Sequence, residues 1–361
     1  MSHHHDSLRV AIAGLIIGVL ASLLTLAGNP GNMGLCIACF VRDSVGALGL
    51  HRAAAVQYLR PEIAGIVLGA LAAALAGREF RSRGGSAPMT RFVLGFCVMI
   101  GCLMFLGCPL RMLLRLAGGD LGALAGLGGF ALGIGVGLLF LNRGYSLGRS
   151  RPQPLGEGLV LPGIQIALLV LLVAAPALLF FTEEGAGPGG KHAAILVSLG
   201  AGLVVGVLAQ RTRLCLMGGF RDLFLFRDTR LLGGFGGLLV GCLGCNLLLT
   251  AVTDGTYFHL SLADQPVAHT NLLWNALGML TAGLGSVLLG GCPLRQLVLA
   301  GEGSSDSAAA VLGLAAGAAF AHNLGLVSSA DGPTAAGRIA VGAALAVLLV
   351  IACLNTFRKA E

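Results

Sequence analysis

Long apolar stretches separated by short polar loops follow one another along almost the whole chain. A hydrocarbon core of about 30 Å is crossed by about 17 to 25 helical residues. On that scale the pattern predicts about ten full membrane spans and an all-α polytopic membrane protein. The predicted spans lie near residues 8–28, 61–77, 91–106, 121–141, 160–181, 192–209, 231–252, 270–290, 308–327 and 334–356.

Four apolar stretches are too short or too polar to cross a membrane alone, and each carries a cysteine at or near its start. They cover residues 33–48, 108–118, 214–227 and 292–302. A helix can end inside the membrane only where protein or a water-filled path satisfies the polar groups of its backbone. Four such helix ends in one chain therefore predict half-helices around one shared cavity.

Two cysteine patterns occur twice. Leu35-Cys36 followed by Arg42-Asp43 matches Leu214-Cys215 followed by Arg221-Asp222. The pentapeptide Gly107-Cys108-Pro109-Leu110-Arg111 recurs unchanged as Gly291-Cys292-Pro293-Leu294-Arg295. These matches indicate two repeat units, and the extra span at 160–181 makes the units inverted relative to each other. The predicted division is a first repeat at 1–141, a linker and connecting span at 142–191, a second repeat at 192–327 and a C-terminal span at 328–361.

Composition and charge support a membrane protein and exclude a nucleic-acid-binding one. The chain is 56% hydrophobic and 11% charged, against roughly 25% charged in soluble domains. The net charge of +7 comes from basic residues in short loops, near residues 78–91, 143–151 and 211–230, and not from one patch. The positive-inside rule predicts that these loops and both termini are cytoplasmic in a bacterial inner membrane.

The Gly-Cys-Pro sequence predicts a cysteine at a helix N-terminus. Pro109 and Pro293 have the fixed φ that starts a helix and need no N–H in its first turn. The preceding Cys108 and Cys292 then lie beside unsatisfied backbone N–H groups and the positive end of the helix dipole, which favour an anion. A thiol is polarisable and a weak hydrogen-bonding group, so it suits a soft anion that carries sulfur or selenium.

The substrate-path residues that we predict are therefore Cys36, Cys39, Cys108, Cys215 and Cys292, supported by Gly107, Pro109, Arg111, Gly291, Pro293 and Arg295. The two arginines have two open interpretations: they attract the anion, or they satisfy backbone carbonyls and neighbouring carboxylates. We expect the Arg42-Asp43 and Arg221-Asp222 pairs to be structural and to hold the ends of their short helices at the membrane interface. Glu62 starts a span, so we expect it in the headgroup zone, with proton coupling as the alternative.

These cysteine motifs resemble those of the YeeE/YedE family of sulfur-transport membrane proteins, over nearly the whole chain. The resemblance implies an importer of thiosulfate or a related compound, with inverted repeats whose short helices meet in an hourglass-like pore. It also implies that substrate passes along successive cysteines, which match Cys36, Cys108 and Cys292 here, with Cys215 as the repeat equivalent of Cys36.

The stretch from Asn32 through Arg42-Asp43 to Leu59-Arg60-Pro61-Glu62 resembles the YedE branch, which is associated with selenium metabolism. That branch implies a cytoplasmic partner, a small SirA/TusA-like sulfurtransferase. Cys39 departs from a single-cysteine entrance, which leaves the substrate open between a selenium compound and a thiosulfate-like anion.

Two other classes of function compete with transport of such an anion. A membrane thiol–disulfide oxidoreductase would use Cys36/Cys39 and Cys242/Cys245 as redox pairs, although these two Cys-x-x-Cys pairs are not equivalent in the repeats. A soft-metal transporter would need His or Met ligands near the cysteines. The segment 185–191 has the Gly-x4-Gly-Lys spacing, but His192 stands where a phosphate-binding loop needs Ser or Thr, so we do not expect ATP to drive transport. We also expect no cofactor, no resident metal and no enzymatic activity.

Overall fold

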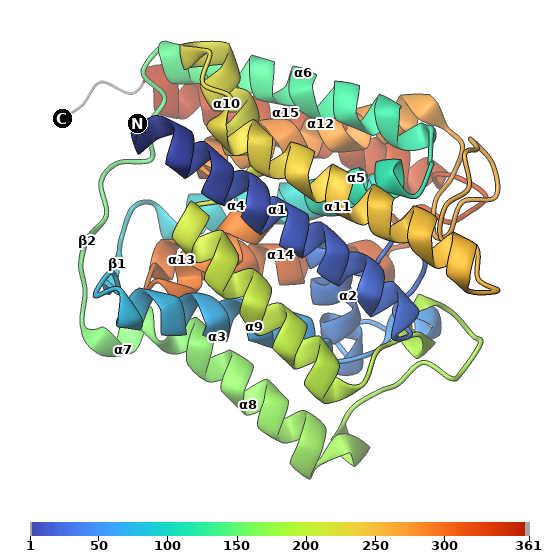
Figure 1. Cartoon of the computed structure of the whole chain (residues 1–361). Coiled ribbons are helices and arrows are strands. Elements are labelled where there is room, and N and C mark those ends of the chain that lie inside the picture. The colour runs from blue at the N-terminus through green and yellow to red at the C-terminus, as the bar shows by residue number, and fades with distance from the viewer. Residues whose placement is uncertain (1, 358–361) are drawn as a thin grey trace.

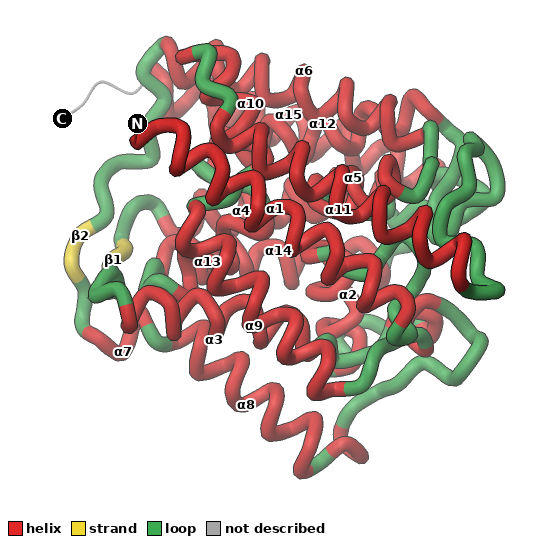
Figure 2. Tube along the Cα trace, viewed as in Figure 1, coloured by secondary structure: helices red, strands yellow, loops and turns green. Residues whose placement is uncertain are grey.

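The computed structural model describes residues 2–357, and most of them are helical (Figures 1 and 2). The outermost residues at both ends of the chain, for which we expect a cytoplasmic position, lie outside the described residues. The helices are α1 (Ser2–Leu26), α2 (Ile37–Ala47), α3 (Pro61–Ala76), α4 (Pro88–Phe105), α5 (Pro109–Ala117), α6 (Gly122–Asn142), α7 (Leu155–Gly158), α8 (Val160–Ala174), α9 (Ile195–Thr212), α10 (Leu216–Phe226), α11 (Arg230–Val252), α12 (Leu272–Leu289), α13 (Pro293–Gly301), α14 (Ser305–Asn323) and α15 (Ala335–Phe357).

The remaining regular elements are small. Three short 3-10 helices lie in loops, at Ala54–Val56, Pro176–Leu178 and Pro188–Gly190. Strands β1 (Arg83–Gly84) and β2 (Arg151–Pro152) form one antiparallel pair. This pair fastens the linker after α6 to the loop after α3, on the side of the molecule that also holds the described start of α1 and end of α15 (Figure 1).

Within residues 2–357, eight helical stretches are long and apolar enough to cross a membrane. They contain α1, α3, α4, α6, α9, α11, α12 and α15, so the chain is a membrane protein. The predicted spans 160–181 and 308–327 correspond to α8 and α14, which are not among the eight. Helix α8 ends at Ala174, since Pro176 disfavours helical backbone just before it. The total of ten spans stays a prediction.

Each long helix of the first half packs on one of the second half. Helix α1 packs on α11, α3 packs on α9, α6 packs on α12, and α4 packs on both α12 and α14. The two halves of the sequence are therefore interleaved in space and share one core, as the mixing of colours in Figure 1 shows.

Glycines set the close approach of these helix pairs. A Cβ atom on Gly14 of α1 would lie 1.7 Å from the carbonyl oxygen of Gly234 in α11, and one on Gly129 of α6 would lie 2.0 Å from that of Ala276 in α12. No side chain fits in such gaps. The 58 glycines of the chain thus permit the backbone contacts by which membrane helices associate.

The four cysteine-bearing stretches form short helices, as predicted. Helix α2 is N-capped by Cys36, α5 by Cys108, α10 by Cys215 and α13 by Cys292. Prolines open α5 and α13 at their first position. A short helix and a cysteine at its N-cap position therefore occur together four times. The sulfurs of Cys36 and Cys215 accept a backbone N–H of their helix, whereas those of Cys108 and Cys292 make no such capping bond.

Candidate functional site

The structure brings the four N-cap cysteines together in two pairs. Cys36 Sγ lies 3.9 Å from Cys108 Sγ, and Cys215 Sγ lies 3.8 Å from Cys292 Sγ. Each pair joins the two short helices of one half of the chain. All four side chains are buried. Because each cysteine occupies the N-cap position of a helix, each pair joins two helix N-termini, where backbone N–H groups favour negative charge.

Cys39 belongs to the cluster around Cys36. Its backbone N–H donates to Cys36 Sγ at 3.3 Å, and its own sulfur lies 3.7 Å from the carbonyl oxygen of Leu106. The equivalent backbone donor in the second half is Gly218, whose N–H lies 3.4 Å from Cys215 Sγ. Gly218 carries no thiol, so the first half has three thiols together and the second half has two.

Arg111 lies behind the first cluster and binds backbone carbonyls. Its guanidinium donates to the carbonyl oxygens of Asn32 at 3.0 Å, Pro266 at 3.2 Å and Val267 at 3.1 Å, and also to that of Leu106. The side chain is fully buried. Of the two open interpretations, carbonyl satisfaction is the one that these contacts support for Arg111.

The glycine of the repeated pentapeptide makes room for its arginine. A Cβ atom on Gly107 would lie 2.9 Å from Arg111 Cδ, and one on Gly291 would lie 3.0 Å from Arg295 Cγ. Glycine and arginine are therefore packed against each other across the turn that presents the cysteine. This contact gives a physical reason for the pentapeptide to be repeated as one unit.

The Arg42-Asp43 pair is more deeply buried than expected. Asp43 Oδ1 accepts from Arg42 Nη2 at 2.6 Å, and Asp43 Oδ2 accepts from Arg60 Nε at 2.9 Å. These three side chains are at most 2% exposed. They form an ion network enclosed by protein, which supports a structural role, and the expected position at the membrane interface stays a prediction. The second-half pair, Arg221 and Asp222, is partly exposed.

Glu62 is also enclosed by protein, and its expected depth in the headgroup zone stays a prediction. Its side chain is fully buried, and its Oε1 accepts from Asn29 Nδ2 and Ser198 Oγ, each at 2.9 Å. Because Ser198 belongs to α9, the carboxyl group joins the two halves of the chain. Sequence reasoning missed this role since the partners come from distant segments.

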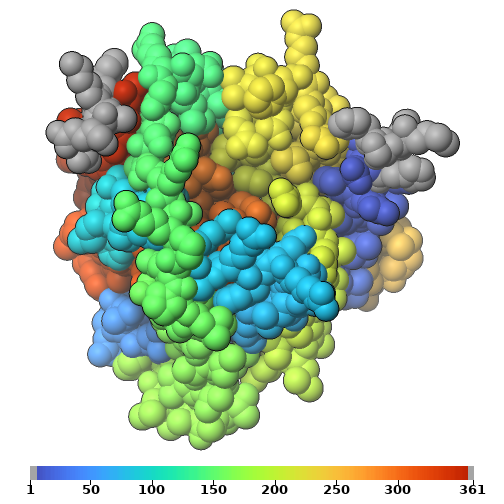
Figure 3. Space-filling model, turned by 90° about the vertical axis from the view of Figure 1, so that its left-hand side faces the viewer, coloured from blue at the N-terminus to red at the C-terminus, as the bar shows by residue number. Residues whose placement is uncertain are grey.

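The second cysteine pair lies beside a large cavity. The cavity has a volume of about 980 Å³, and its wall includes Cys215, Gly218 and Gly290. Figure 3 looks onto the side of the molecule that holds the described chain ends, where a hollow opens between the yellow and blue segments. Its charged lining side chains are Asp6, Arg9, Arg211, Arg213, Arg221, Asp222, Arg230 and Arg295. Six arginines against two aspartates make it electropositive.

The gathering of these arginines could not be predicted from the sequence. They come from α1, from the end of α9 and the turn after it, and from α10, α11 and α13. The charge pattern indicated only which basic loops share one side of the membrane. Arg295 and Arg213 also line a neighbouring cavity of about 450 Å³. In it Arg295 Nη1 lies 3.1 Å from Glu302 Oε1, so Arg295, unlike Arg111, has a carboxylate partner.

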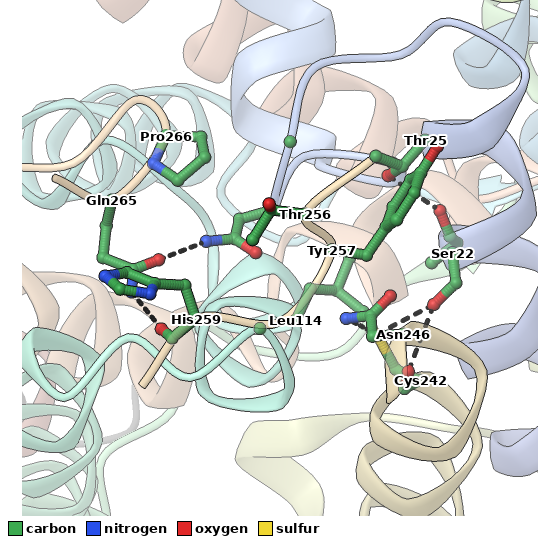
Figure 4. Close-up of a pocket in the computed structure, with 15 residues that line it drawn as sticks. Ser22, Thr25, Leu114, Cys242, Asn246, Thr256, Tyr257, His259, Gln265 and Pro266 are labelled. Atoms are coloured by element: carbon green, nitrogen blue, oxygen red, sulfur yellow. Dashed lines mark hydrogen bonds between the residues drawn. The ribbon is translucent and has the colours of Figure 1, made fainter. Parts of the chain in front are cut away.

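A third cavity, of about 90 Å³, lies between α1, α11 and the loop that follows α11 (Figure 4). Its lining includes Cys242, whose sulfur accepts from Ser22 Oγ at 3.3 Å and from Asn246 Nδ2 at 3.6 Å. These contacts give Cys242 a role in joining α1 to α11. Its Cys-x-x-Cys partner Cys245 is only partly buried.

The described residues hold ten free cysteines. Among residues 2–357 no group of three or more His, Cys, Asp or Glu side chains has the arrangement of a metal site.

Comparisons with known proteins match part of the chain. The profile of a family described as "Sulphur transport" matches residues 211–357, which include Cys215 and Cys292. The thiosulfate transporter TsuA of Spirochaeta thermophila is 32% identical over 109 residues. That alignment covers 30% of this chain and 31% of the relative. The similarity to sulfur transporters is thus established for a part of the chain.

Proposed function

We propose that this chain is a transporter of the sulfur-transport (YeeE/YedE) family, which imports a small sulfur- or selenium-containing anion. The observation that carries the proposal is the pairing of cysteines at short-helix N-termini, with sulfurs 3.9 Å apart for Cys36 and Cys108 and 3.8 Å apart for Cys215 and Cys292. The matches to the sulphur-transport profile and to a thiosulfate transporter support it.

The paired thiols offer such an anion a route through the core. Moving a small dianion through bare hydrocarbon costs tens of kcal/mol. Helix N-termini and polarisable sulfurs lower that cost because they replace part of the hydration shell. In this proposal the anion contacts the cluster of Cys36, Cys39 and Cys108 first. It then passes the pair of Cys215 and Cys292 and leaves through the electropositive cavity, by transient contacts and without covalent turnover.

The architecture that we propose is two inverted repeats, with the boundaries predicted from the sequence. The packing of the long helices supports it. In the proposed repeats α1 corresponds to α9, α3 to α11, α4 to α12 and α6 to α14. Exchanging each helix with its counterpart turns the pair α1–α11 into α9–α3 and the pair α6–α12 into α14–α4. All four pairs pack in the structure. Such an exchange is what a two-fold axis produces. In inverted repeats this axis lies in the membrane plane, and transporters built this way bind substrate near the midplane.

The orientation that we propose has the arginine-lined cavity facing the cytoplasm of a bacterial cell, with the protein in the inner membrane. The positive-inside rule supports this, since most loop arginines lie on that side. We further propose a small TusA-like sulfurtransferase as the acceptor of the imported chalcogen. The cavity has a volume of about 980 Å³ and Cys215 lies in its wall, so an acceptor on that side can reach Cys215.

Uptake measurements test the proposal. Cells that lack their own sulfur and selenium import would express the wild type, Cys108→Ala, Cys292→Ala or the control Cys97→Ala, at matched membrane abundance. Cys97 is buried in α4 outside the cysteine clusters. Radiolabelled thiosulfate and selenite are offered separately. We expect uptake of at least one in the wild type and the control, and its loss in the other two variants. A wild type that imports neither compound would contradict the proposal.

A further inference from the structure

The two cysteine clusters differ in how easily a small molecule reaches them. Cys36 and Cys108 are 0% and 1% exposed, and neither lines any of the three cavities described above. Cys215 and Cys292 are 5% and 4% exposed, and Cys215 lines the cavity of about 980 Å³. A water-sized reagent in that cavity therefore contacts Cys215, whose sulfur is 3.8 Å from that of Cys292, while Cys36 and Cys108 stay covered.

The two thiols of the second pair also lie close enough to form a disulfide with little movement. The sulfurs are 3.8 Å apart, and a disulfide requires about 2.05 Å, a gap that side-chain rotation can close in large part. Both residues are N-caps, so their backbones are fixed by α10 and α13. The N–H of Cys292 lies 3.5 Å from Cys215 Sγ, and that of Gly218 lies 3.4 Å from it. These contacts hold Cys215 Sγ beside its partner at the cavity wall.

We propose that Cys215 and Cys292 form a reversible disulfide when a peroxide reaches the cavity, and that this bond closes the transport path. The formation of the bond rests on the geometry alone, whereas the closure rests on the proposed function. The site is distinct from the Cys-x-x-Cys pairs that the sequence offers as redox pairs. Its reagent is a small hydroperoxide, and its regenerating reagent is a cytoplasmic thiol.

The chemistry balances in two steps. The Cys215 thiol attacks hydrogen peroxide, the O–O bond breaks, and a sulfenic acid and one water form. The Cys292 thiol then attacks the sulfenic sulfur, an S–S bond forms, and a second water leaves. The two thiols lose two electrons and two protons in total, and the peroxide takes up both. Two thiols of a reductant reverse the change by thiol–disulfide exchange and become a disulfide themselves.

The bond would act on the path in two ways. It removes both thiol hydrogens, so neither sulfur can donate to a passing anion. It also ties the start of α10 to the start of α13, which prevents the two helix N-termini from separating. Cytoplasmic thiols are normally kept reduced, so the bond would form only under oxidative load and would reopen afterwards.

The test begins with the purified protein carrying Cys353→Ser, which removes the one exposed thiol. The protein is treated with hydrogen peroxide and analysed by intact mass and peptide mapping. We expect the loss of two hydrogens and a cross-link between the peptides of Cys215 and Cys292. Cys36→Ser/Cys108→Ser should retain this cross-link, and Cys215→Ser should lose it. An unchanged mass, or a cross-link at another pair, would overturn the disulfide.

Transport is measured in a second step on the same samples in proteoliposomes. We expect peroxide to abolish uptake of thiosulfate or selenite, and dithiothreitol to restore it. Unchanged uptake by a protein that carries the cross-link would overturn the closure. If the untreated protein imports neither anion, the proposed function fails, and the cross-link result still decides whether the redox pair exists.

Discussion

Arg111 and Arg295 hold the same position in two identical pentapeptides but make different contacts. Arg111 is fully buried and donates to four backbone carbonyls, whereas Arg295 is partly exposed at a cavity wall and pairs with Glu302. The carbonyls of Pro266 and Val267 belong to the long loop between α11 and α12. Arg111 thus fastens this loop over the first cysteine cluster.

This difference predicts different losses of stability for the two alanine substitutions. Hydrogen bonds to a charged group contribute about 1.5–3 kcal/mol each, so we expect Arg111→Ala to lower the free energy of unfolding by several kcal/mol. Arg295 has one carboxylate partner where Arg111 has four carbonyl partners, and Glu302 keeps Arg83 within 4.0 Å, so Arg295→Ala should destabilise the protein less than Arg111→Ala. Thermal unfolding of the detergent-solubilised proteins measures both. Equal loss of stability in the two variants would contradict the structural difference.

Arg295→Ala should instead change transport. The removal of one of the six arginines that line the large cavity lowers its positive potential. We expect weaker apparent affinity for the anion at low ionic strength, and a smaller difference from the wild type in high salt, where charges are screened. Uptake at a series of substrate and salt concentrations measures this. An effect that does not depend on salt would argue against an electrostatic role.

Two neighbouring glycines of α6, Gly128 and Gly129, provide a matched pair of positions for testing the contact between α6 and α12. A Cβ atom on Gly129 would lie 2.0 Å from the carbonyl oxygen of Ala276, whereas one on Gly128 would meet nothing within 4 Å. We expect Gly129→Ala to destabilise the protein by about 1–3 kcal/mol, as overpacking does. Gly128→Ala should be neutral or slightly stabilising because alanine favours helix over glycine. The midpoints of thermal unfolding compare the two, and a reversed order would contradict the helix contact.

Asp43 and Asp222 occupy equivalent positions in the repeated sequence and also predict different outcomes. Asp43 is fully buried between Arg42 and Arg60, so Asp43→Asn leaves two guanidinium groups without a counter-charge. Such a loss costs about 3–5 kcal/mol. Asp222 pairs only with the partly exposed Arg221, and Asp222→Asn should cost less than about 1 kcal/mol. Membrane abundance and unfolding temperature distinguish the two variants, and similar values would contradict the buried network.

The rival oxidoreductase hypothesis makes its own prediction. If Cys242 and Cys245 form a redox pair, Cys242→Ser/Cys245→Ser should abolish activity. Since Cys242 accepts hydrogen bonds from Ser22 and Asn246, we expect this double variant to keep its uptake of thiosulfate or selenite. Lost uptake at normal membrane abundance would favour the rival. Cys36→Ser is the positive control, for which we expect lost uptake.

The repeated cysteine motifs were enough to predict four short helices and the position of a cysteine at the start of each. That success has a local cause. A proline or a capping residue fixes the start of a helix through the backbone of a few neighbouring residues. The burial of Glu62 and Asp43 was not predictable in this way, because their partners Ser198 and Arg60 reach them only through the packing of α9 and the turn before α3.

The sequence by itself determined that this is a helical membrane protein with two cysteine motifs that each occur twice and four short helices that begin at a cysteine. Those properties depend on composition, on hydrophobic length and on contacts within one helical turn. Only the tertiary structure decided which cysteines pair, that Arg111 is enclosed while Arg295 borders a cavity, and that arginines from five segments line that cavity. These properties depend on which distant segments meet, and two identical pentapeptides differ because the residues packed around them differ.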